Sequence, residues 1–487
     1  MKILLLPLDE RPCNYDFPKM LADTDEIELI MPPRSILGNK KTPGDTDVIA
    51  EFLIENSDCD AAIISIDMLV YGGLIPSRLH KLNKEEAFSR LNALKKLRKK
   101  CKNIYAFNCV MRTPQYDSSE EEPDYYADFG FALFRRKYII DYLERNGSDE
   151  ELEKELSEIN IPEDIIKDYE ERRAINSLVN LETVNLLEAN IIDFLVIPQD
   201  DSSPYGYTAL SQQPVIEAIA QKELDTRAMV YPGADEVALS LLARAYNDYK
   251  KVKPKFFPVW ASAAGPNIIP LYEDRPMLES LKAHVRVCGG RLVYSPEQAD
   301  VILAINCPGK AVQDTYDERI DVSYSSYRNL LDFAYQIQEF LQEGKQVALI
   351  DSAFCNGGDM RLINYLDRLG VLSRLLAYAG WNTNCNSTGT VLSQVCFGEN
   401  KRNLIYRIID DACYQAAVRH NVENLELDEL GLSFSNEAQI KKIEALVKTR
   451  LQEYYNKLKI SREFPVKIKS VSLPWNRMFE IGLNLLV

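Results

Sequence analysis

Short apolar runs alternate with longer stretches of helical apolar spacing along most of the chain. The short runs are rich in Ile, Val, Leu and Ala and have the length of strands. This alternation is typical of βα units that build a parallel sheet. Eight runs are predicted to be strands: Ile3–Leu8, Ile27–Met31, Ala61–Ile66, Ile104–Val110, Ile192–Ile197, Ala228–Tyr231, Val347–Ile350 and Leu375–Ala379.

Eight strands of this kind favour an α/β fold with a (β/α)₈ barrel-like core. A doubly wound open sheet produces the same rhythm and is the alternative. In both folds ligands bind where the strands end, so the prediction of a site at the carboxyl ends does not depend on the choice between them.

The spacing of the predicted elements divides the chain into three parts. Residues 1–252 together with 340–400 hold the eight strands and are predicted to form a split barrel-like catalytic domain. Residues 253–339 are predicted to be a small inserted α/β subdomain, and residues 401–487 a mainly helical C-terminal region. The inserted part has its own strand-like runs at Phe256–Ala261, Arg291–Tyr294 and Val301–Ile305.

Two adjacent acids, Asp200 and Asp201, follow directly after the predicted strand Ile192–Ile197. Adjacent carboxylates repel, so if both are partly buried one pKa should rise and separate the acid role from the base role. We therefore predict that Asp200 and Asp201 are catalytic. The structural alternative is that one of them caps the next helix.

Other strand-end segments supply carboxylates, amides, arginines and aromatic rings. Such groups bond sugar hydroxyls, and an aromatic ring can stack on the apolar face of a sugar ring. The predicted substrate-binding residues are Asp9, Arg11, Asp67, Arg112, Tyr205, Asp235, Glu236, Asn356, Asp359, Trp381 and Asn382.

Composition limits the partners of this chain. The 57 Lys and Arg against 73 Asp and Glu give a net charge of −16, which repels nucleic acid and anionic membrane surfaces. The apolar start Met1–Leu8 reaches charged residues too soon for a signal peptide or a membrane span, so a cytoplasmic protein is expected. The expected partner is a small carbohydrate, and the oligomeric state stays open.

Histidine, cysteine and glycine patterns limit the chemistry. The 10 cysteines include no C-x-x-C pair, the 3 histidines are dispersed, and no Gly-rich phosphate-binding signature is present. No metal site and no cofactor are predicted. Any catalysis would therefore run mainly on carboxylates and amides.

Several motifs occur in one order along the chain: Leu6–Pro12, Gln199–Gly206, Tyr231–Glu236, Ala379–Thr383 and Leu473–Glu480. Together they resemble the bacterial family catalogued as domain of unknown function 4127, over nearly the whole chain. The resemblance implies a bacterial source and brings no assigned activity.

The Asp200–Asp201 pair is also similar in local pattern to the paired acids of the hexosaminidase clans. In those enzymes one acid polarises an acetamido group and its neighbour protonates the leaving oxygen.

The leading hypothesis is a carboxylate-dependent glycoside hydrolase, or a related carbohydrate-active enzyme, that acts on a small sugar conjugate. The similarity to the hexosaminidase clans implies an N-acetylated sugar. One alternative is a divalent-metal-dependent hydrolase, with oxygen ligands from Asp9, Asp67, Asp200, Asp201, Asp235 and Asp359. The other alternative is a non-catalytic sugar-binding protein.

Overall fold

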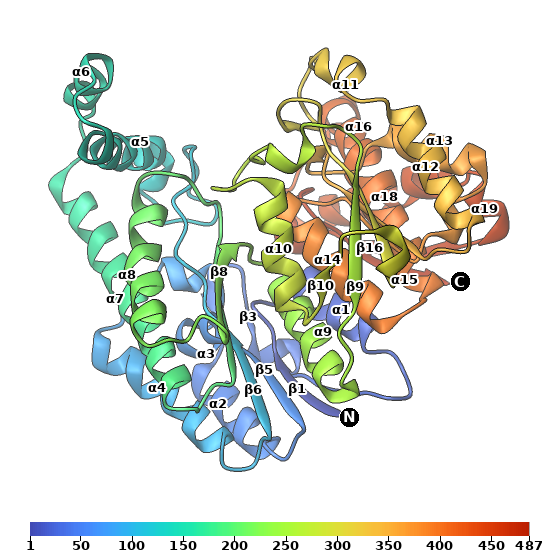
Figure 1. The fold of residues 1–487 in the computed structure, drawn as a ribbon. Coiled ribbons are helices and arrows are strands. Elements are labelled where there is room, and N and C mark those ends of the chain that lie inside the picture. The colour runs from blue at the N-terminus through green and yellow to red at the C-terminus, as the bar shows by residue number, and fades with distance from the viewer. Residues whose placement is uncertain (487) are drawn as a thin grey trace. The chain divides into compact units, whose positions relative to one another are not determined.

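The computed structural model describes residues 1–486 (Figure 1). The chain forms two compact units. The first unit holds Met1–Leu241 and the short segment Tyr272–Asp274, and the second holds Leu242–Leu271 and the residues from Arg275 on. The boundary at residues 241 and 242 falls inside helix α9 (Val237–Lys250).

The first unit is built on a six-stranded sheet in which all neighbouring strands are parallel. Its strands, in spatial order, are β2 (Glu28–Ile30), β1 (Lys2–Leu6), β5 (Ala61–Ser65), β6 (Asn103–Phe107), β7 (Phe194–Gln199) and β8 (Ala228–Pro232). Numbered along the chain this order is 2-1-3-4-5-6, which begins with the 2-1-3-4-5 order of flavodoxin-like doubly wound sheets.

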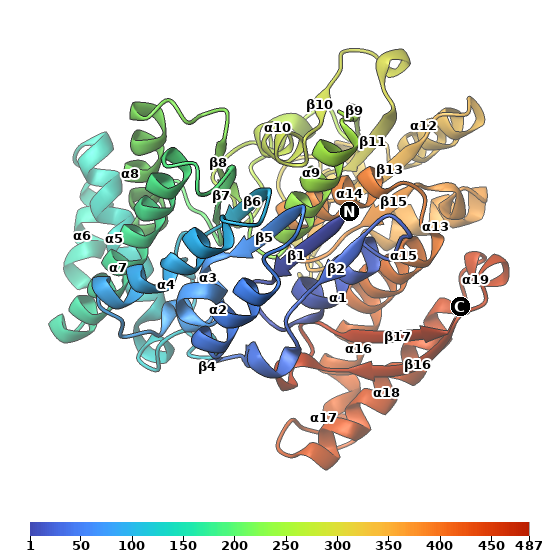
Figure 2. The same cartoon turned by 90° about the horizontal axis from the view of Figure 1, so that it is seen from below.

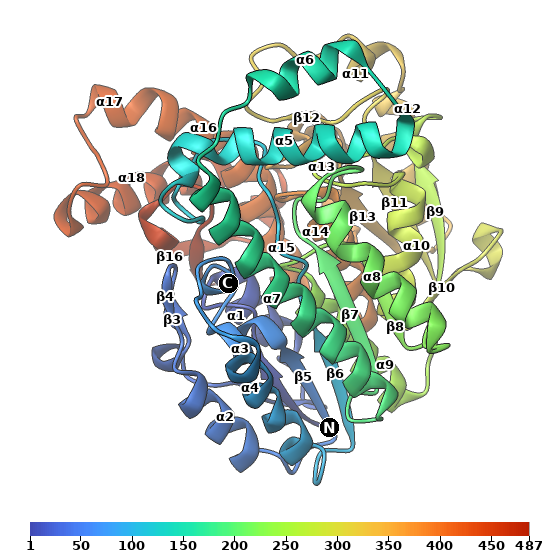
Figure 3. The ribbon, with the colours of Figure 1, turned by 90° about the vertical axis from the view of Figure 1, so that its left-hand side faces the viewer.

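Apolar side chains on one face of this sheet form the core of the first unit. Leu4, Ile64 and Leu195 from the strands pack with residues of the flanking helices, among them Leu53 and Leu94. The helices of the unit are α1 (Pro12–Leu21), α2 (Thr46–Glu55), α3 (Ile66–Tyr71), α4 (Lys84–Leu97), α5 (Tyr126–Asn146), α6 (Glu150–Glu158), α7 (Glu163–Glu188) and α8 (Tyr207–Gln221). Figure 3 shows α2, α4 and α7 side by side over this face.

The second unit is built on a five-stranded parallel sheet. Its spatial order is β10 (Arg291–Leu292), β9 (Lys255–Trp260), β11 (Val301–Asn306), β13 (Val347–Asp351) and β15 (Ala377–Ala379). Numbered along the chain this is again 2-1-3-4-5. The two units therefore repeat one strand order, although no repeat is visible in the sequence.

Helices of the second unit surround and follow this sheet. They include α10 (Met277–Val287), α12 (Leu330–Gln342), α13 (Met360–Leu369), α14 (Asn384–Phe397), α15 (Lys401–Arg407), the π-helical segment η6 (Ile408–Val418) and α18 (Glu437–Tyr455). The antiparallel hairpin of β16 (Lys467–Ser472) and β17 (Gly482–Leu486) packs along α18 (Figure 2). Among the helices of residues 1–486, none is both long enough and apolar enough to cross a membrane.

The predicted α/β class is confirmed, and every predicted strand position holds a strand. The predicted grouping of the strands differs from the pairing in the structure. Val347–Asp351 and Ala377–Ala379 do not join the first six strands but pair with the strands of residues 253–339, because β13 lies beside β11 along five residue pairs. Buried parallel strands all read as continuous apolar runs, so the pattern locates strands without naming their neighbours.

Candidate functional site

The two predicted catalytic residues lie in the turn that follows β7. Asp200 accepts a hydrogen bond from the guanidinium of Arg78 at 2.6 Å, and Asp201 accepts one from Arg112 at 3.1 Å. The side chains of Asp200 and Asp201 are each 18% exposed, so both are accessible at the edge of a mostly buried network. Asp201 has a backbone φ of 44°, a left-handed conformation that Asp and Asn adopt more readily than most residues.

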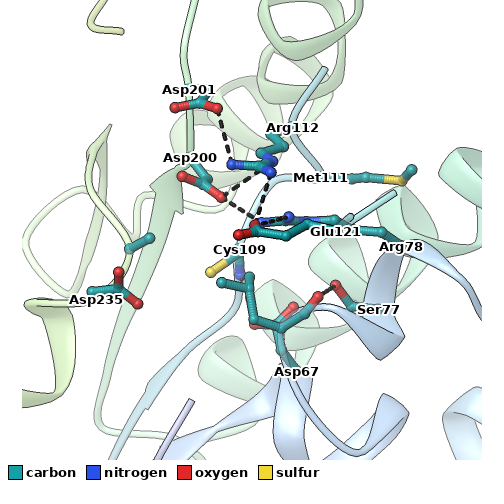
Figure 4. A network of polar contacts seen from close by, with 12 residues as sticks. Asp67, Ser77, Arg78, Cys109, Met111, Arg112, Glu121, Asp200, Asp201 and Asp235 are labelled. Atoms are coloured by element: carbon teal, nitrogen blue, oxygen red, sulfur yellow. Dashed lines mark hydrogen bonds and ion pairs between the residues drawn. The ribbon is translucent and has the colours of Figure 1, made fainter. Parts of the chain in front are cut away.

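Arg78 and Arg112 share two further carboxylates, Glu121 and Glu122. Glu122 accepts from Arg78 at 3.1 Å and from Arg112 at 2.8 Å, and Glu121 accepts from the same two guanidiniums at 3.2 and 2.9 Å. Figure 4 shows both arginines turned toward the carboxylates at the end of β7. We call these six side chains the arginine–carboxylate network: Arg78, Arg112, Glu121, Glu122, Asp200 and Asp201.

The two adjacent acids have different environments. Burial raises the pKa of Asp201 to about 6; the neighbouring charge of Asp200 adds to this rise and Arg112 opposes it. Both acids contact an arginine, but Asp200 lies closer to Arg78, at 2.6 Å, than Asp201 does to Arg112, at 3.1 Å. One carboxyl group therefore holds its proton to a higher pH while its neighbour lies against a buried cation, which is the separation of roles that acid–base chemistry requires.

Distant parts of the chain hold the turn in place. The backbone N–H of Ser202 donates to the carbonyl of Tyr272 at 2.9 Å, and the N–H of Gly206 donates to the buried carboxylate of Asp141 at 2.8 Å. Gln199 donates to Asp274 at 3.3 Å. The segment Tyr272–Asp274 thus belongs to the first unit because it anchors the turn that carries Asp200 and Asp201.

A second polar cluster lies at the ends of β1 and β8. Arg11 donates to Asp9 at 2.7 Å and to Asp235 at 2.6 Å, and Asn14 donates to Asp235 at 2.9 Å. All four side chains are buried. Three strands lie between β1 and β8, a separation of roughly 19 Å at ordinary strand spacing, so the loops must bend toward each other over the carboxyl ends. Glu236 turns back to accept from the N–H of Ala234.

Asp67, in the first turn of α3 directly after β5, is buried and accepts from the backbone N–H of Cys109 at 2.9 Å. Burial raises its pKa to about 6, because desolvation outweighs the hydrogen bond that favours the charged form. Burial also raises the pKa of the Cys109 thiol well above its ordinary value, and the charges of Asp67 and Asp200 add to this effect. Cys109 is therefore a neutral thiol among the strand-end carboxylates (Figure 4).

Tyr205 does not turn toward the arginine–carboxylate network. Its ring packs edge-on against Tyr138 and Tyr142 of α5, at centroid distances of 5.3 and 5.0 Å, and its hydroxyl accepts from Asn146. The predicted binding role of Tyr205 has no support in these contacts. The tyrosine instead fixes the far end of the turn to α5.

The remaining predicted residues lie in the second unit, at the ends of β13 and β15. The N–H of Asn356 donates to the carbonyl of Asn382 at 2.8 Å, so the two amide-rich loops do meet. Trp381 is 8% exposed, its indole N–H donates to Thr390 at 3.2 Å, and the guanidinium of Arg407 lies over its ring at 5.3 Å. These contacts place the ring inside the unit, where it stabilises the loop.

Asp359 belongs to a buried polar cluster of the second unit. It accepts from Arg328 at 2.8 Å, and its other oxygen caps α13 by accepting from the N–H of Arg361 at 3.0 Å. Asp351, at the end of β13, accepts from the N–H of Asp359 at 2.8 Å and from Asn306 at 2.7 Å. Burial, followed by the charge of Asp359, raises the pKa of Asp351 to about 7.

This shift predicts a pH dependence of stability. Because folded Asp351 keeps a proton up to pH about 7 whereas an unfolded Asp releases it near pH 4, its contribution to stability is present at low pH. That contribution is lost as the pH rises from about 4 to about 7. Asp351→Asn should make the free energy of unfolding less dependent on pH. Urea unfolding at pH 5 and pH 8 would measure this. The exposed Asp332→Asn is the control, and equal pH slopes for Asp351→Asn and the unchanged protein would contradict the expectation.

Sequence reasoning did not identify Glu121 and Glu122, the two acids that complete the arginine–carboxylate network. Arg78, Glu121 and Glu122 occupy the centre of the arginine–carboxylate network, although Arg78 lies more than 100 residues before Asp200. In the second unit, Arg407 pairs with Asp411 at the start of η6, and Asp411 also accepts from the N–H of Gly380 at 2.8 Å. The one available signal was the position of Arg78 in a Gly/Pro-marked segment after a strand.

The predicted aspartates do not form one cluster. Each of Asp200, Asp201 and Asp235 pairs with an arginine, and Asp67 accepts from a backbone N–H. Within residues 1–486, no group of three or more His, Cys, Asp or Glu side chains has the arrangement needed to hold a metal ion.

Comparison with known proteins identifies the family of the chain. No curated protein matches this chain. A family model, described as protein of unknown function (DUF4127), matches residues 3–484 and confirms the resemblance noted from the motifs. The chain therefore belongs to the family of proteins of unknown function DUF4127.

Proposed function

We propose that the chain is a carboxylate-dependent glycoside hydrolase, or a related carbohydrate-active enzyme, acting on a small sugar conjugate. One observation carries the proposal: burial raises the pKa of Asp201 although Arg112 lies 3.1 Å away, while the adjacent Asp200 pairs with Arg78 at 2.6 Å. Both side chains are 18% exposed. Glycoside hydrolysis uses one carboxyl group as proton donor and a second, ionised one on the other side of the reaction centre.

Asp201 is the proton donor in this proposal. Its proton passes to the glycosidic oxygen as the bond from that oxygen to the anomeric carbon breaks. Oδ2 of Asp200 is paired with Arg78, and Oδ1 has no partner in residues 1–486, so Oδ1 accepts the proton of the water that attacks the anomeric carbon. The products are the free sugar and the leaving alcohol. Asp201 is then ionised and Asp200 protonated, and proton exchange with solvent restores the starting states.

The place of the pair in the fold supports the proposal. In doubly wound sheets, ligands bind outside the carboxyl ends of the strands, and the Asp200–Asp201 turn follows β7 directly. The loops from β1 and β8 that join through Arg11 and Asp235 lie at the same edge of the first sheet. Asp9, Arg11 and Asp235 would then shape the pocket rather than carry the reaction.

A panel of aryl glycosides tests the proposal. The purified protein is expected to release the aryl alcohol from at least one glycoside, with the same rate before and after treatment with a chelator, because the mechanism uses carboxyl groups alone. Sugar binding without turnover would replace the proposal with a sugar-binding protein. Loss of activity on chelation, restored by a divalent cation, would replace it with a metal-dependent hydrolase.

A further inference from the structure

The charged side chains of the arginine–carboxylate network differ in how exposed they are to solvent. The side chains of Arg78, Glu122 and Arg112 are 1%, 1% and 10% exposed, whereas those of Glu121, Asp200 and Asp201 are 17%, 18% and 18% exposed. A ligand that approaches the network therefore meets Glu121, Asp200 and Asp201 before it meets Glu122 and the two guanidiniums.

The network also has more negative than positive charge. Two guanidiniums face four carboxyl groups, a formal charge of −2 with all four ionised and −1 with Asp201 protonated. Asp67 and Asp235, the latter paired with Arg11, are further acidic groups near enough to act on the Cys109 thiol. A cation is attracted to this edge, and a phosphate, sulfate or carboxylate group is repelled.

One buried atom of the network lacks a donor. Glu122 is 1% exposed, and its Oε1 accepts from both arginines, but its Oε2 has no hydrogen-bond partner in residues 1–486. Buried carboxylate oxygens are almost always hydrogen-bonded, so a bound group is expected to supply a donor here. Oδ1 of Asp200 likewise has no partner among these residues, although it is partly exposed to solvent.

We propose that the substrate carries a protonated amine, as a free amino sugar does, and that Glu121, Glu122 and Asp200 bind this ammonium group. The inference rests on the proposed function and names its substrate class. An ammonium group has three N–H donors and no acceptor, which suits a group of carboxylate oxygens. N-acetylation removes the positive charge and two of these donors, so an N-acetylated sugar is expected to bind more weakly.

Calorimetric titration with three nonreactive ligands tests the inference separately from catalysis. The ligands are the thioglycosides of a 2-amino-2-deoxy sugar, of its N-acetyl form and of a 6-phosphorylated neutral sugar. We expect the amine to bind at least about tenfold more tightly than the N-acetyl form, a difference of about 1.4 kcal/mol, and the phosphorylated sugar to bind most weakly. Added salt should weaken the amine complex most.

Three variants locate the effect. Glu122→Gln and Glu121→Gln should each reduce the preference for the amine to less than about threefold, and Glu121→Gln keeps the test available if the buried Glu122→Gln does not fold. Glu120→Gln is the matched control, because Glu120 is the neighbour of Glu121 with a side chain 62% exposed. It should keep the full preference.

The outcomes separate the two proposals. Equal binding of the amine and the N-acetyl form, with turnover of aryl glycosides, would overturn the amine inference and leave the glycosidase proposal in place. Saturable binding of Mg²⁺ or Ca²⁺ alone that blocks the amine would also overturn the inference and favour a metal site. Absence of both binding and turnover for every sugar would overturn both proposals.

Discussion

Asp201→Asn is expected to lower the turnover number on a cleavable aryl glycoside by roughly 10²- to 10⁴-fold, the usual contribution of a general acid. The substitution removes the proton that Asp201 gives to the leaving oxygen. Asparagine tolerates the left-handed φ of 44° at this position, so the turn should keep its shape. The measurement is steady-state release of the aryl alcohol at pH 5.5, with circular dichroism to show that the variant is folded.

A matched change elsewhere in the same unit controls for lost charge. Asp16 forms an exposed ion pair with Arg34, and its side chain is 39% exposed. Asp16→Asn should therefore leave turnover within a factor of two. If Asp201→Asn is as active as Asp16→Asn, Asp201 is not the proton donor.

Arg78→Met is expected to lower the free energy of unfolding of the first unit by about 3–5 kcal/mol, the cost of removing one partner of a buried ion network. The guanidinium of Arg78, whose side chain is 1% exposed, pairs with Glu121, Glu122 and Asp200. Methionine fills the volume but leaves these carboxylates without their shared cation. Urea unfolding at pH 7, followed by circular dichroism, measures the loss.

Arg34→Met is the control for this stability prediction. Arg34 pairs only with Asp16 among carboxylates in residues 1–486, and its side chain is 46% exposed, so the change should cost less than about 1 kcal/mol. A loss below 1 kcal/mol for Arg78→Met as well would show that the arginine–carboxylate network is not a structural unit of the folded protein.

The sequence allowed the strands and the polar segments after them to be located. Runs such as Ala61–Ser65 are buried at every residue and read as continuous apolar stretches, so the pattern identified them directly. The same uniformity gives no information about which strands are neighbours. β13 resembles β1 in composition but pairs with β11 in the sheet of the second unit. Strand neighbours depend on which faces the connecting helices cover, and a local pattern does not contain that information.

The candidate site was predictable only where neighbouring residues supply the chemistry. The adjacent acids Asp200 and Asp201 repel each other whatever the fold, so a raised pKa for one of them could be anticipated from the chain alone. Which groups contact these two acids depends on the fold. Arg78 comes from the segment after β5, and the carbonyl of Tyr272 reaches Ser202 from a segment flanked on both sides by the second unit.

The aromatic and amide motif of the second unit shows that residue type alone does not decide what a side chain binds. Trp381 and Asn356 have the residue types of a sugar site, yet the indole of Trp381 contacts Thr390 and Arg407. The side-chain amide of Asn356 donates to Asp314 at 2.5 Å. Residue type indicates which groups a side chain can bind, and burial decides whether a ligand or the protein supplies them. The proposed chemistry therefore depends on the first unit alone.

The pKa of Asp201 is the most direct test of the central claim. Carbon-13 NMR titration of the aspartate carboxyl groups, with Asp201→Asn to assign the signal, should give a pKa of about 6 for Asp201. Because the acid must be protonated to act, turnover should then fall as the pH rises through the same value. A pKa near 4 for Asp201, the ordinary value for an aspartate, would contradict the assignment of this residue as the proton donor.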